Sequence, residues 1–217
     1  MKKKLVIFDF DGTLVDTITD VGICFNEALL RCGFPTHPIE MYTHFVGGNL
    51  ETVVSRLLPR ECISDENIDN VKTIYRELYL SSCKPNTKPF SGIVDLLYTL
   101  QNSGVKVAIH TNKAQLLVDD LCERFFKQIS FVGIWGYNPN FPSKPDAFGV
   151  NQIMEKASVL PSESVYVGDG LTDVLTSENA GIDCIYVTWG QGKPGDTESD
   201  AVKHIVNEVS ELKFILC

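Results

Sequence analysis

Two aspartates, Asp9 and Asp11, stand one residue apart directly after a short apolar run in the segment VIFDFDGTLVDT. If the alternation of a β-strand continues past Phe8, both carboxylates face the same side of the chain, ~6.6 Å apart. One carboxylate of such a pair can be a nucleophile or a metal ligand. The other, its pKa raised by its neighbour's negative charge, can serve as general acid and base. The pair therefore predicts covalent or proton-transfer chemistry at the end of a strand.

Polar side chains also follow other apolar runs that we predict to be strands. Thr111 and Asn112 follow one run, Asp169 and Asp173 follow another, and Lys144 opens a predicted helix. Because ligands of open parallel sheets bind beyond the carboxyl ends of the strands, we expect these groups to meet at one edge. Several carboxylates there would demand a compensating cation, and a hard, oxygen-liganded ion such as Mg²⁺ fits. Such an edge is a receptor for an oxyanion, most naturally a phosphoryl group.

The strands that would position these groups are five short apolar runs, rich in Val and Ile and too short for helices. They cover residues 4–8, 105–110, 131–136, 164–167 and 183–188. Helical patterns with one apolar face lie between them, over residues 93–101, 114–126, 146–157 and 173–180. The alternation predicts a doubly wound α/β core with a parallel, Rossmann-like sheet.

One stretch, between Leu14 and Cys83, interrupts this alternation. It holds a helical stripe ended by Gly33 and further helical patterns near residues 50–58 and 68–80, with no convincing strand. The segment CKPNTKPFSG, with its two prolines, is expected to lead the chain back to the core. We therefore predict an α/β catalytic core of residues 1–14 and 84–217 and an inserted, all-helical cap domain of residues 15–83.

The composition limits the partners. The 217 residues carry a formal net charge of −9, and basic residues form no run beyond residues 2–4, so we expect no nucleic-acid partner. No segment approaches the ~18 uninterrupted apolar residues of a membrane helix. The apolar stretch after the basic start is also too short for a signal peptide. We expect a cytoplasmic protein, monomeric or homodimeric, with a small phosphorylated metabolite as its partner and no membrane contact.

Four segments together resemble a known enzyme family. DFDGTLVDT, HTNK, SKPD and VGDGLTD match, in order and approximate spacing, the motifs of the haloacid dehalogenase (HAD) superfamily, in its phosphatase branch with a helical cap inserted after the first motif. Two longer stretches, KPFSGIVDLLYTLQNSGVKVAIHTNK and AGIDCIYVTWGQG, look like phosphoglycolate phosphatases. The resemblance implies a magnesium-dependent phosphatase that hydrolyses a small phosphomonoester, of phosphoglycolate type, through an aspartyl phosphate.

The resemblance also implies roles for the matched residues. Asp9 would attack phosphorus, while Asp11 would protonate the leaving alcohol and then deprotonate the water that hydrolyses the acyl phosphate. Thr111 and the Asn112 backbone would hold non-bridging oxygens of the substrate. Lys144 would neutralise Asp9 and the transferring group.

The magnesium ligands implied in the same way are an Asp9 oxygen, the Asp11 main-chain carbonyl and Asp169. Asp173 would lie behind these ligands or compete as one of them. Gly12 would contribute to the substrate-binding turn that leads into the cap. The sequence leaves open whether Asp173 simply caps the helix that follows it.

Other activities remain open within the family. A β-phosphoglucomutase-like phosphomutase keeps both aspartates, and pyrophosphatase or nucleotidase activity is compatible with this cap class. A dehalogenase is disfavoured because Asp11 is needed to protonate an alkoxide but not a halide. A signalling receiver domain also clusters aspartates with Thr and Lys, but it lacks an insert of this size. A non-catalytic binding protein is disfavoured because all the charged motif residues are present.

For three residues near the motifs, the sequence is compatible with a purely structural role. Asp16 is expected at a helix start, where an acidic side chain is favourable. Lys113 is as compatible with a solvated helix start as with a substrate contact. His110 has no metal-ligand spacing to another histidine and is expected to be structural, lining the site only through its neighbour Thr111.

Overall fold

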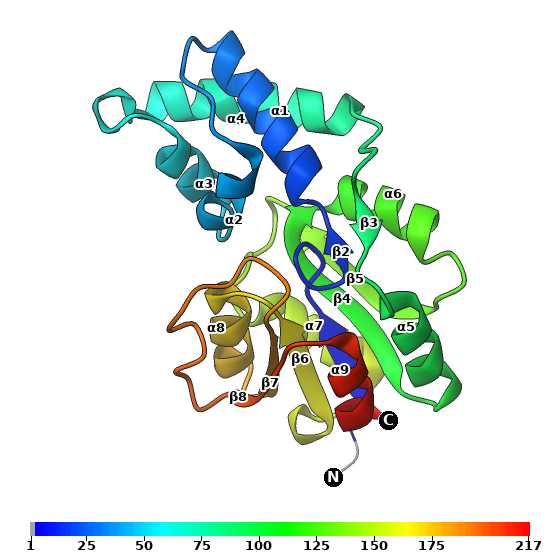
Figure 1. Ribbon diagram of the computed structural model, residues 1–217. Helices are drawn as coiled ribbons and strands as arrows, with labels where there is room; N and C mark the ends of the chain where they lie inside the picture. The colour runs from blue at the N-terminus through cyan, green and yellow to red at the C-terminus, as the bar shows by residue number, and fades with distance from the viewer. Residues whose placement is uncertain (1–2) are drawn as a thin grey trace. The chain divides into compact units, whose positions relative to one another are not determined.

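The computed structural model describes residues 3–217, which form two compact units (Figure 1). The core unit contains the described chain up to Val15 together with residues 89–217. The helical unit contains Asp16–Lys88. The sequence placed the two boundaries after residues 14 and 83. The segment expected as a return linker, residues 83–92, is divided here, with residues 83–88 in the helical unit and residues 89–92 in the core unit.

A six-stranded sheet forms the centre of the core unit, in the order β5-β4-β1-β6-β7-β8. Its strands are β1 (Leu5–Phe8), β4 (Lys106–Ala114), β5 (Phe131–Tyr137), β6 (Ser164–Gly168), β7 (Asp183–Val187) and β8 (Val202–Val206). Every neighbouring pair is parallel, so all the strands end at the same edge. β1 lies between β4 and β6, where the strand order reverses and where ligands of such sheets bind.

Helices cover both faces of this sheet, which confirms the predicted doubly wound α/β core. One face carries α5 (Ile93–Asn102), α6 (Gln115–Phe125) and α9 (Val209–Leu216). The other face carries α7 (Phe148–Ala157), and α8 (Leu171–Asn179) packs against β6 and β7. A 3₁₀ turn, Pro161–Glu163, leads into β6.

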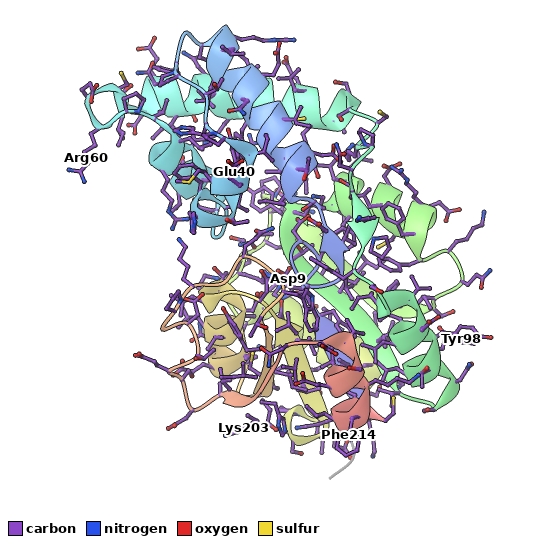
Figure 2. All side chains as sticks on the ribbon, viewed as in Figure 1. Asp9, Glu40, Arg60, Tyr98, Lys203 and Phe214 are labelled. Carbon is purple, nitrogen blue, oxygen red and sulfur yellow. The ribbon has the colours of Figure 1, made fainter. Side chains whose placement is uncertain are left out.

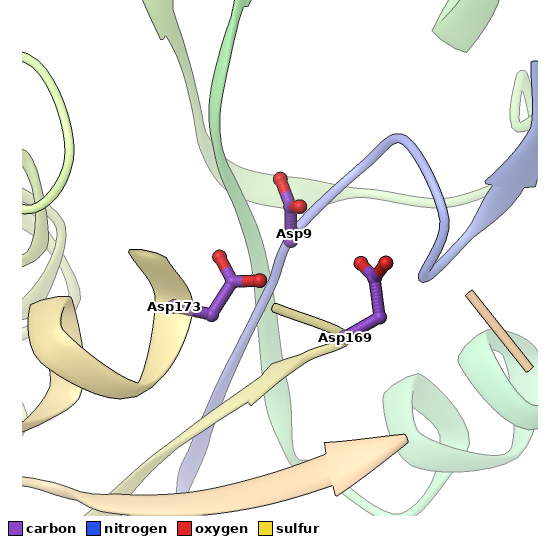
Figure 3. A group of neighbouring side chains, drawn as sticks. All are labelled: Asp9, Asp169 and Asp173. Atoms are coloured by element: carbon purple, nitrogen blue, oxygen red, sulfur yellow. The ribbon is translucent and has the colours of Figure 1, made fainter. Parts of the chain in front are cut away.

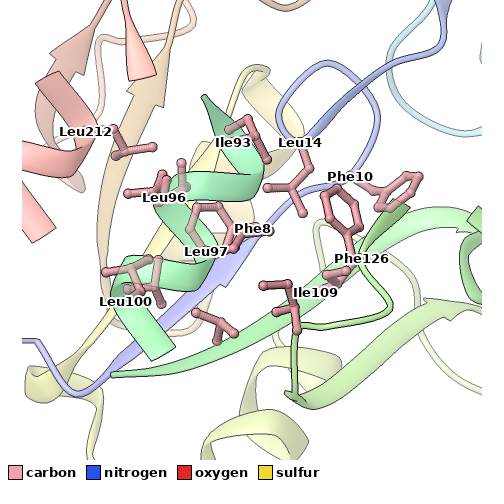
Figure 4. Close-up of a cluster of buried hydrophobic side chains, with 14 of the residues drawn as sticks. Phe8, Phe10, Leu14, Ile93, Leu96, Leu97, Leu100, Ile109, Phe126 and Leu212 are labelled. Atoms are coloured by element: carbon pink, nitrogen blue, oxygen red, sulfur yellow. The ribbon is translucent and has the colours of Figure 1, made fainter. Parts of the chain in front are cut away.

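The two faces of β1 belong to two different apolar clusters. Phe8 and Phe10 are fully buried with Leu97 of α5 in one cluster (Figure 4). Ile7 packs with α7 in the other cluster. Full burial of one such side chain stabilises the fold by about 1.5–3 kcal/mol. Because Phe10 shares the cluster of Phe8, the alternation continues past the end of β1. Asp9 therefore extends the row that contains Ile7.

The helical unit holds four α-helices in the described chain. They are α1 (Ile18–Arg31), α2 (Tyr42–Phe45), α3 (Leu50–Leu57) and α4 (Asp65–Ser81), with 3₁₀ turns at Ile39–Met41 and Arg60–Cys62. Asn49 and Ser64 cap α3 and α4, since each side chain accepts a hydrogen bond from a backbone N–H of the first turn. Phe25 of α1 stacks on Tyr75 of α4, with ring centroids 3.7 Å apart.

A buried carboxylate ties the end of the helical unit to its first helix. Asp20 of α1 is 2% exposed. It accepts hydrogen bonds from the backbone N–H and side-chain amide of Asn86, at 3.0 and 2.9 Å, and from the Thr87 hydroxyl at 2.7 Å. Three donors satisfy this carboxylate without a cation.

Several short or terminal elements of the structure were not predicted. β2 (Val15–Asp16) pairs with β3 (Lys88–Pro89), so a short strand does occur in the stretch expected to be purely helical. Asp16 ends β2 directly before α1, and its Oδ1 accepts a hydrogen bond from the Ile18 N–H at 3.4 Å, which agrees with the helix start expected for this residue. β8 and α9 close the chain beyond the last predicted strand.

Within residues 3–217, no helix combines the length and the apolar character needed to cross a bilayer. Single large apolar side chains do lie on the surface of the core unit, such as Tyr98 on α5 and Phe214 on α9 (Figure 2). Isolated exposures of this kind are common on protein surfaces.

Candidate active site

Three buried carboxylates meet at the carboxyl edge of the sheet (Figure 3). Asp9 follows β1, Asp169 follows β6, and Asp173 lies in the first turn of α8. One oxygen of each lies within 4.8 Å of the oxygens of the other two. All three residues are less than a tenth exposed. Like charges this close in a desolvated site repel one another, so the cluster requires compensating positive charge.

Lys144 brings one positive charge into this cluster. Its Nζ lies 2.8 Å from Asp9 Oδ1 and 2.6 Å from Asp173 Oδ1. Its side chain is 4% exposed. Burial alone would lower the pKa of Lys144, but the charges of Asp173 and Asp9 hold that pKa well above its usual value. Lys144 is therefore a fixed cation here and not a proton donor or acceptor.

One lysine does not neutralise three carboxylates. Burial raises the pKa of Asp9 above its usual value, and the charge of Asp173 adds to that rise. Burial raises the pKa of Asp169 well above its usual value, with the charges of Asp173 and Asp9 as further causes. Apart from its ion pair with Lys144, Asp9 Oδ1 accepts no hydrogen bond within the described chain. An underneutralised cluster with an unsatisfied acceptor fits a hard divalent cation.

Asp169 and Asp173 differ in the groups that their carboxylate oxygens already contact. Asp173 uses both oxygens, because Oδ1 pairs with Lys144 and Oδ2 accepts from the backbone N–H of Gly170 at 3.1 Å. Asp169 accepts one hydrogen bond on each oxygen, from Thr13 Oγ1 at 2.9 Å and from the Gln191 N–H at 2.7 Å. Since these donors are neutral, Asp169 keeps its charge available for a cation. The charge of Asp173 is instead paired with that of Lys144.

Glycines bring the backbone close to Asp169. Gly12 has φ +84°, a conformation that other residues rarely adopt, and a Cβ there would collide with the Asp169 carboxylate. A Cβ at Gly190 would collide with the same carboxylate. Gly190 and Gln191 belong to the segment WGQG, in which the sequence revealed no site residue. The available signal was a Gly-x-Gly pattern after a strand, which is too common to identify a site by itself.

Asp11 differs from the three clustered carboxylates because its ion-pair partner is Lys113 and not Lys144. Lys113 Nζ donates to Asp11 Oδ1 at 2.9 Å and to Oδ2 at 3.2 Å. The Lys113 side chain is only 5% exposed and that of Asp11 is 26% exposed. β4 continues to Ala114, beyond the end predicted at residue 110, so Lys113 belongs to a strand and not to a solvated helix start. Sequence reasoning did not find this ion pair, for which the only hint was Lys113 beside the Thr-Asn pair.

The two polar residues before Lys113 are placed differently from each other. Thr111 is 4% exposed, and its hydroxyl accepts from the Lys113 N–H at 3.2 Å. The side chain of Asn112 brackets the main chain of Lys144. Its Oδ1 accepts from the Lys144 N–H at 3.0 Å, and its Nδ2 donates to the Lys144 carbonyl at 3.2 Å. This bracket joins the end of β4 to the segment that carries the buried lysine.

Known proteins resemble this fold and sequence over most of their length. A family model described as haloacid dehalogenase-like hydrolase matches residues 6–187. The chain belongs to this family. The phosphoglycolate phosphatase of Pseudomonas putida is 31% identical over 205 residues, which cover 92% of this chain and 75% of the relative. That of Vibrio parahaemolyticus is 28% identical, over 96% of this chain and 94% of the relative.

Solved structures of the family support the same assignment. A provisionally assigned phosphoglycolate phosphatase from Lactobacillus delbrueckii subsp. bulgaricus superposes with a TM-score of 0.92 at 27% identity, covering 100% of this chain and 99% of the other. A haloacid dehalogenase-like hydrolase from Streptococcus pneumoniae gives a TM-score of 0.85 at 26% identity, covering 97% and 96%. The resemblance stated from the four motifs is confirmed, and the chain is a HAD hydrolase similar to phosphoglycolate phosphatases.

The HAD hydrolase should lose stability as the pH falls below about 6.5, partly through His110. This residue is 1% exposed beside Tyr166 and Lys144. Burial, and then the charge of Lys144, lower the pKa of His110 from 6.5 to about 3. Between these values the unfolded state binds one more proton than the folded state, so each pH unit removes about 1.4 kcal/mol of stability from this group.

Denaturant titrations of the HAD hydrolase from about pH 7 to about pH 4 check this prediction. The variant His110→Asn has no imidazole to protonate, so its stability should decline less steeply with falling pH than that of the wild type. Parallel declines in the two proteins would contradict the role given to His110. A uniform offset between the curves would report only the packing lost in the variant.

Proposed function

We propose that this HAD hydrolase is a magnesium-dependent phosphatase that cleaves a small phosphomonoester through an aspartyl phosphate on Asp9. The observation that carries the proposal is the buried Asp9 carboxylate at the end of β1, beside the Lys144 ammonium and the Asp169 carboxylate. Relatives named phosphoglycolate phosphatase support a phosphoglycolate-type substrate. The predicted cytoplasmic location and monomeric or homodimeric state stay predictions.

The residues proposed to hold Mg²⁺ are Asp9, Asp169 and the main-chain carbonyl of Asp11. Asp173 is proposed to act through Lys144, because both of its oxygens already have partners. When bound, Mg²⁺ would supply positive charge to the phosphoryl oxygens and relieve the repulsion between the carboxylates. The raised pKa values of Asp9 and Asp169 support this proposal, because a bound cation would favour the charged form of both carboxylates.

Each side chain at the sheet edge then has one task. Asp9 provides the carboxylate oxygen that bonds to phosphorus as the alcohol leaves. Lys144 keeps that carboxylate and the transferring group electrostatically balanced, and the Thr111 hydroxyl donates to a non-bridging oxygen. Asp11 gives a proton to the departing alkoxide and later takes one from the water that cleaves the acyl phosphate. Lys113 fixes where the Asp11 carboxylate lies through its two short contacts.

Phosphate release from a panel of esters should require Mg²⁺ and should be fastest, by kcat/KM, with phosphoglycolate. The panel contains phosphoglycolate, pyrophosphate, sugar phosphates and nucleotides, each assayed with Mg²⁺, with EDTA, and with Mg²⁺ restored after EDTA. Activity should fall to background with EDTA and return with Mg²⁺, because the carboxylate cluster needs a divalent cation. No release from any ester would contradict the phosphatase. A sugar bisphosphate that accumulates in place of free phosphate would identify a phosphomutase.

A further inference from the structure

The ammonium group of Lys144 has a neighbour on a third side. Besides Asp9 and Asp173, the ring of Tyr166 faces this group, with 5.8 Å between Nζ and the ring centroid. An aromatic face attracts an ammonium group at this separation. A lysine ammonium sits on a flexible four-carbon stem, so its position is set by the groups around its tip.

Tyr166 is itself fixed by a hydrogen bond across the sheet. It is fully buried on β6, and its hydroxyl donates to the main-chain oxygen of His110 at 2.7 Å. The His110 and Tyr166 rings meet edge to face, with centroids 6.0 Å apart. β1 lies between β6 and β4, so this bond bridges the two strands that flank the Asp9 strand. Neither residue has another part in the proposed chemistry.

The far side of His110 is closed by α7. A Cβ at Gly149 would collide with His110 Nε2, so glycine at this position lets the helix approach the imidazole. Burial keeps the pKa of His110 low, at about 3, so the ring is neutral and adds no second cation next to Lys144. The imidazole therefore acts as an uncharged backing for Tyr166 in a fully packed environment.

We propose that Tyr166, held by His110, is a positioning residue that keeps the Lys144 ammonium directed at Asp9. The two ion pairs of Lys144 are unequal, since the contact to Asp173 is shorter than that to Asp9. Without the ring at its back, the ammonium would settle on Asp173 and move away from the nucleophile. The inference rests on the proposed function, because Lys144 matters to turnover only if Asp9 receives the phosphoryl group.

The loss of Tyr166 would affect the tip of Lys144 and not its backbone. The main chain of Lys144 is bracketed independently by two hydrogen bonds from the Asn112 side chain. We therefore expect Tyr166→Leu to lower kcat about tenfold or more while KM changes less than about twofold. Tyr166→Phe keeps the ring but loses the bond to His110, and we expect it to lower kcat only about threefold.

Val165→Ala provides the matched control for these variants. Val165 is buried on the same strand, in the cluster on the opposite face of the sheet, so its truncation costs stability without touching Lys144. Its kcat should stay within about twofold of the wild type. Tyr166→Phe serves as the test variant if Tyr166→Leu does not fold.

A second measurement needs no substrate. The ¹H–¹⁵N correlation spectrum of the lysine ammonium groups should contain a signal for the buried Lys144, identified by its absence in Lys144→Met. That signal should disappear or broaden in Tyr166→Leu and persist in Val165→Ala. If Tyr166→Leu keeps both this signal and the kcat of Val165→Ala, the positioning role is wrong.

The two measurements also separate this inference from the proposed function. A lost Lys144 signal with unchanged kcat would support the positioning by Tyr166 and contradict the catalytic part given to Lys144. If the wild type releases no phosphate from any ester, the phosphatase proposal fails, and the spectra alone decide whether Tyr166 holds the ammonium in place.

Discussion

Replacing Asp9 with Asn should lower kcat by more than about a thousandfold while the protein stays folded. An amide has nearly the shape of a carboxylate, but it cannot bond to phosphorus as a nucleophile. The fold should tolerate the change because Asp9 is one of three carboxylates that crowd a buried site, where burial and Asp173 already disfavour its charge. Phosphate release and thermal unfolding of the same preparation measure the two effects.

The matched control for Asp9→Asn is Asp120→Asn, which makes the same chemical change at an exposed position on α6. Its activity should equal that of the wild type. Residual activity of Asp9→Asn above about a thousandth of the wild type would exclude the covalent route. The assay needs a preparation free of contaminating phosphatases, so a preparation of the variant from which the protein has been removed by affinity depletion sets the background.

Asp11→Asn should cost most with substrates whose leaving groups are poor. An alkoxide needs a proton as it departs, whereas the phenolate from an activated aryl phosphate does not, so the first step with an aryl phosphate should survive. We expect a loss of about 10²–10⁴ in kcat/KM for alkyl phosphates and a much smaller one for aryl phosphates. Asn can still accept a hydrogen bond from Lys113, so the side chain should keep its place.

Rapid mixing with an aryl phosphate sharpens the test of Asp11. If Asp11 also activates the water of the second step, Asp11→Asn should release one phenolate per protein molecule in a burst and then turn over slowly. Equal losses for alkyl and aryl substrates, without a burst, would exclude both proton-transfer roles. The aryl substrate is thus an internal control for substrate binding, because it enters the same site.

The sequence predicted the central strands because strands buried on both faces are continuous apolar runs. β8 was not predicted because it is an edge strand. Its exposed residues Lys203, His204 and Ile205 interrupt any continuous apolar run. The end of β4 was placed too early for a similar reason, since Thr111, Asn112 and Lys113 are polar. Polar residues that a fold buries at a strand end look like loop residues in the sequence.

The candidate site divides in the same way. Asp9, Asp169 and Asp173 were expected at one edge because they follow strands whose ends the topology must align, and the structure places them together. The contacts that hold them could not be predicted. Thr13 and Asp169 are 156 residues apart in the chain, and Asp11 and Lys113 are 102 apart. Such pairs depend on side-chain direction and loop course, for which a single sequence carries no periodic signal.

The Asp20 carboxylate has a consequence beyond the packing of α1. By binding Asn86 and Thr87, it holds the last residues of the helical unit against the first helix. Hydrogen bonds between residues of the inserted segment itself thus hold its first helix and its last residues together. An insertion closed at its own base needs nothing from its host except two adjacent chain ends. Such a segment can be exchanged as one piece while the sheet edge and its carboxylates are kept.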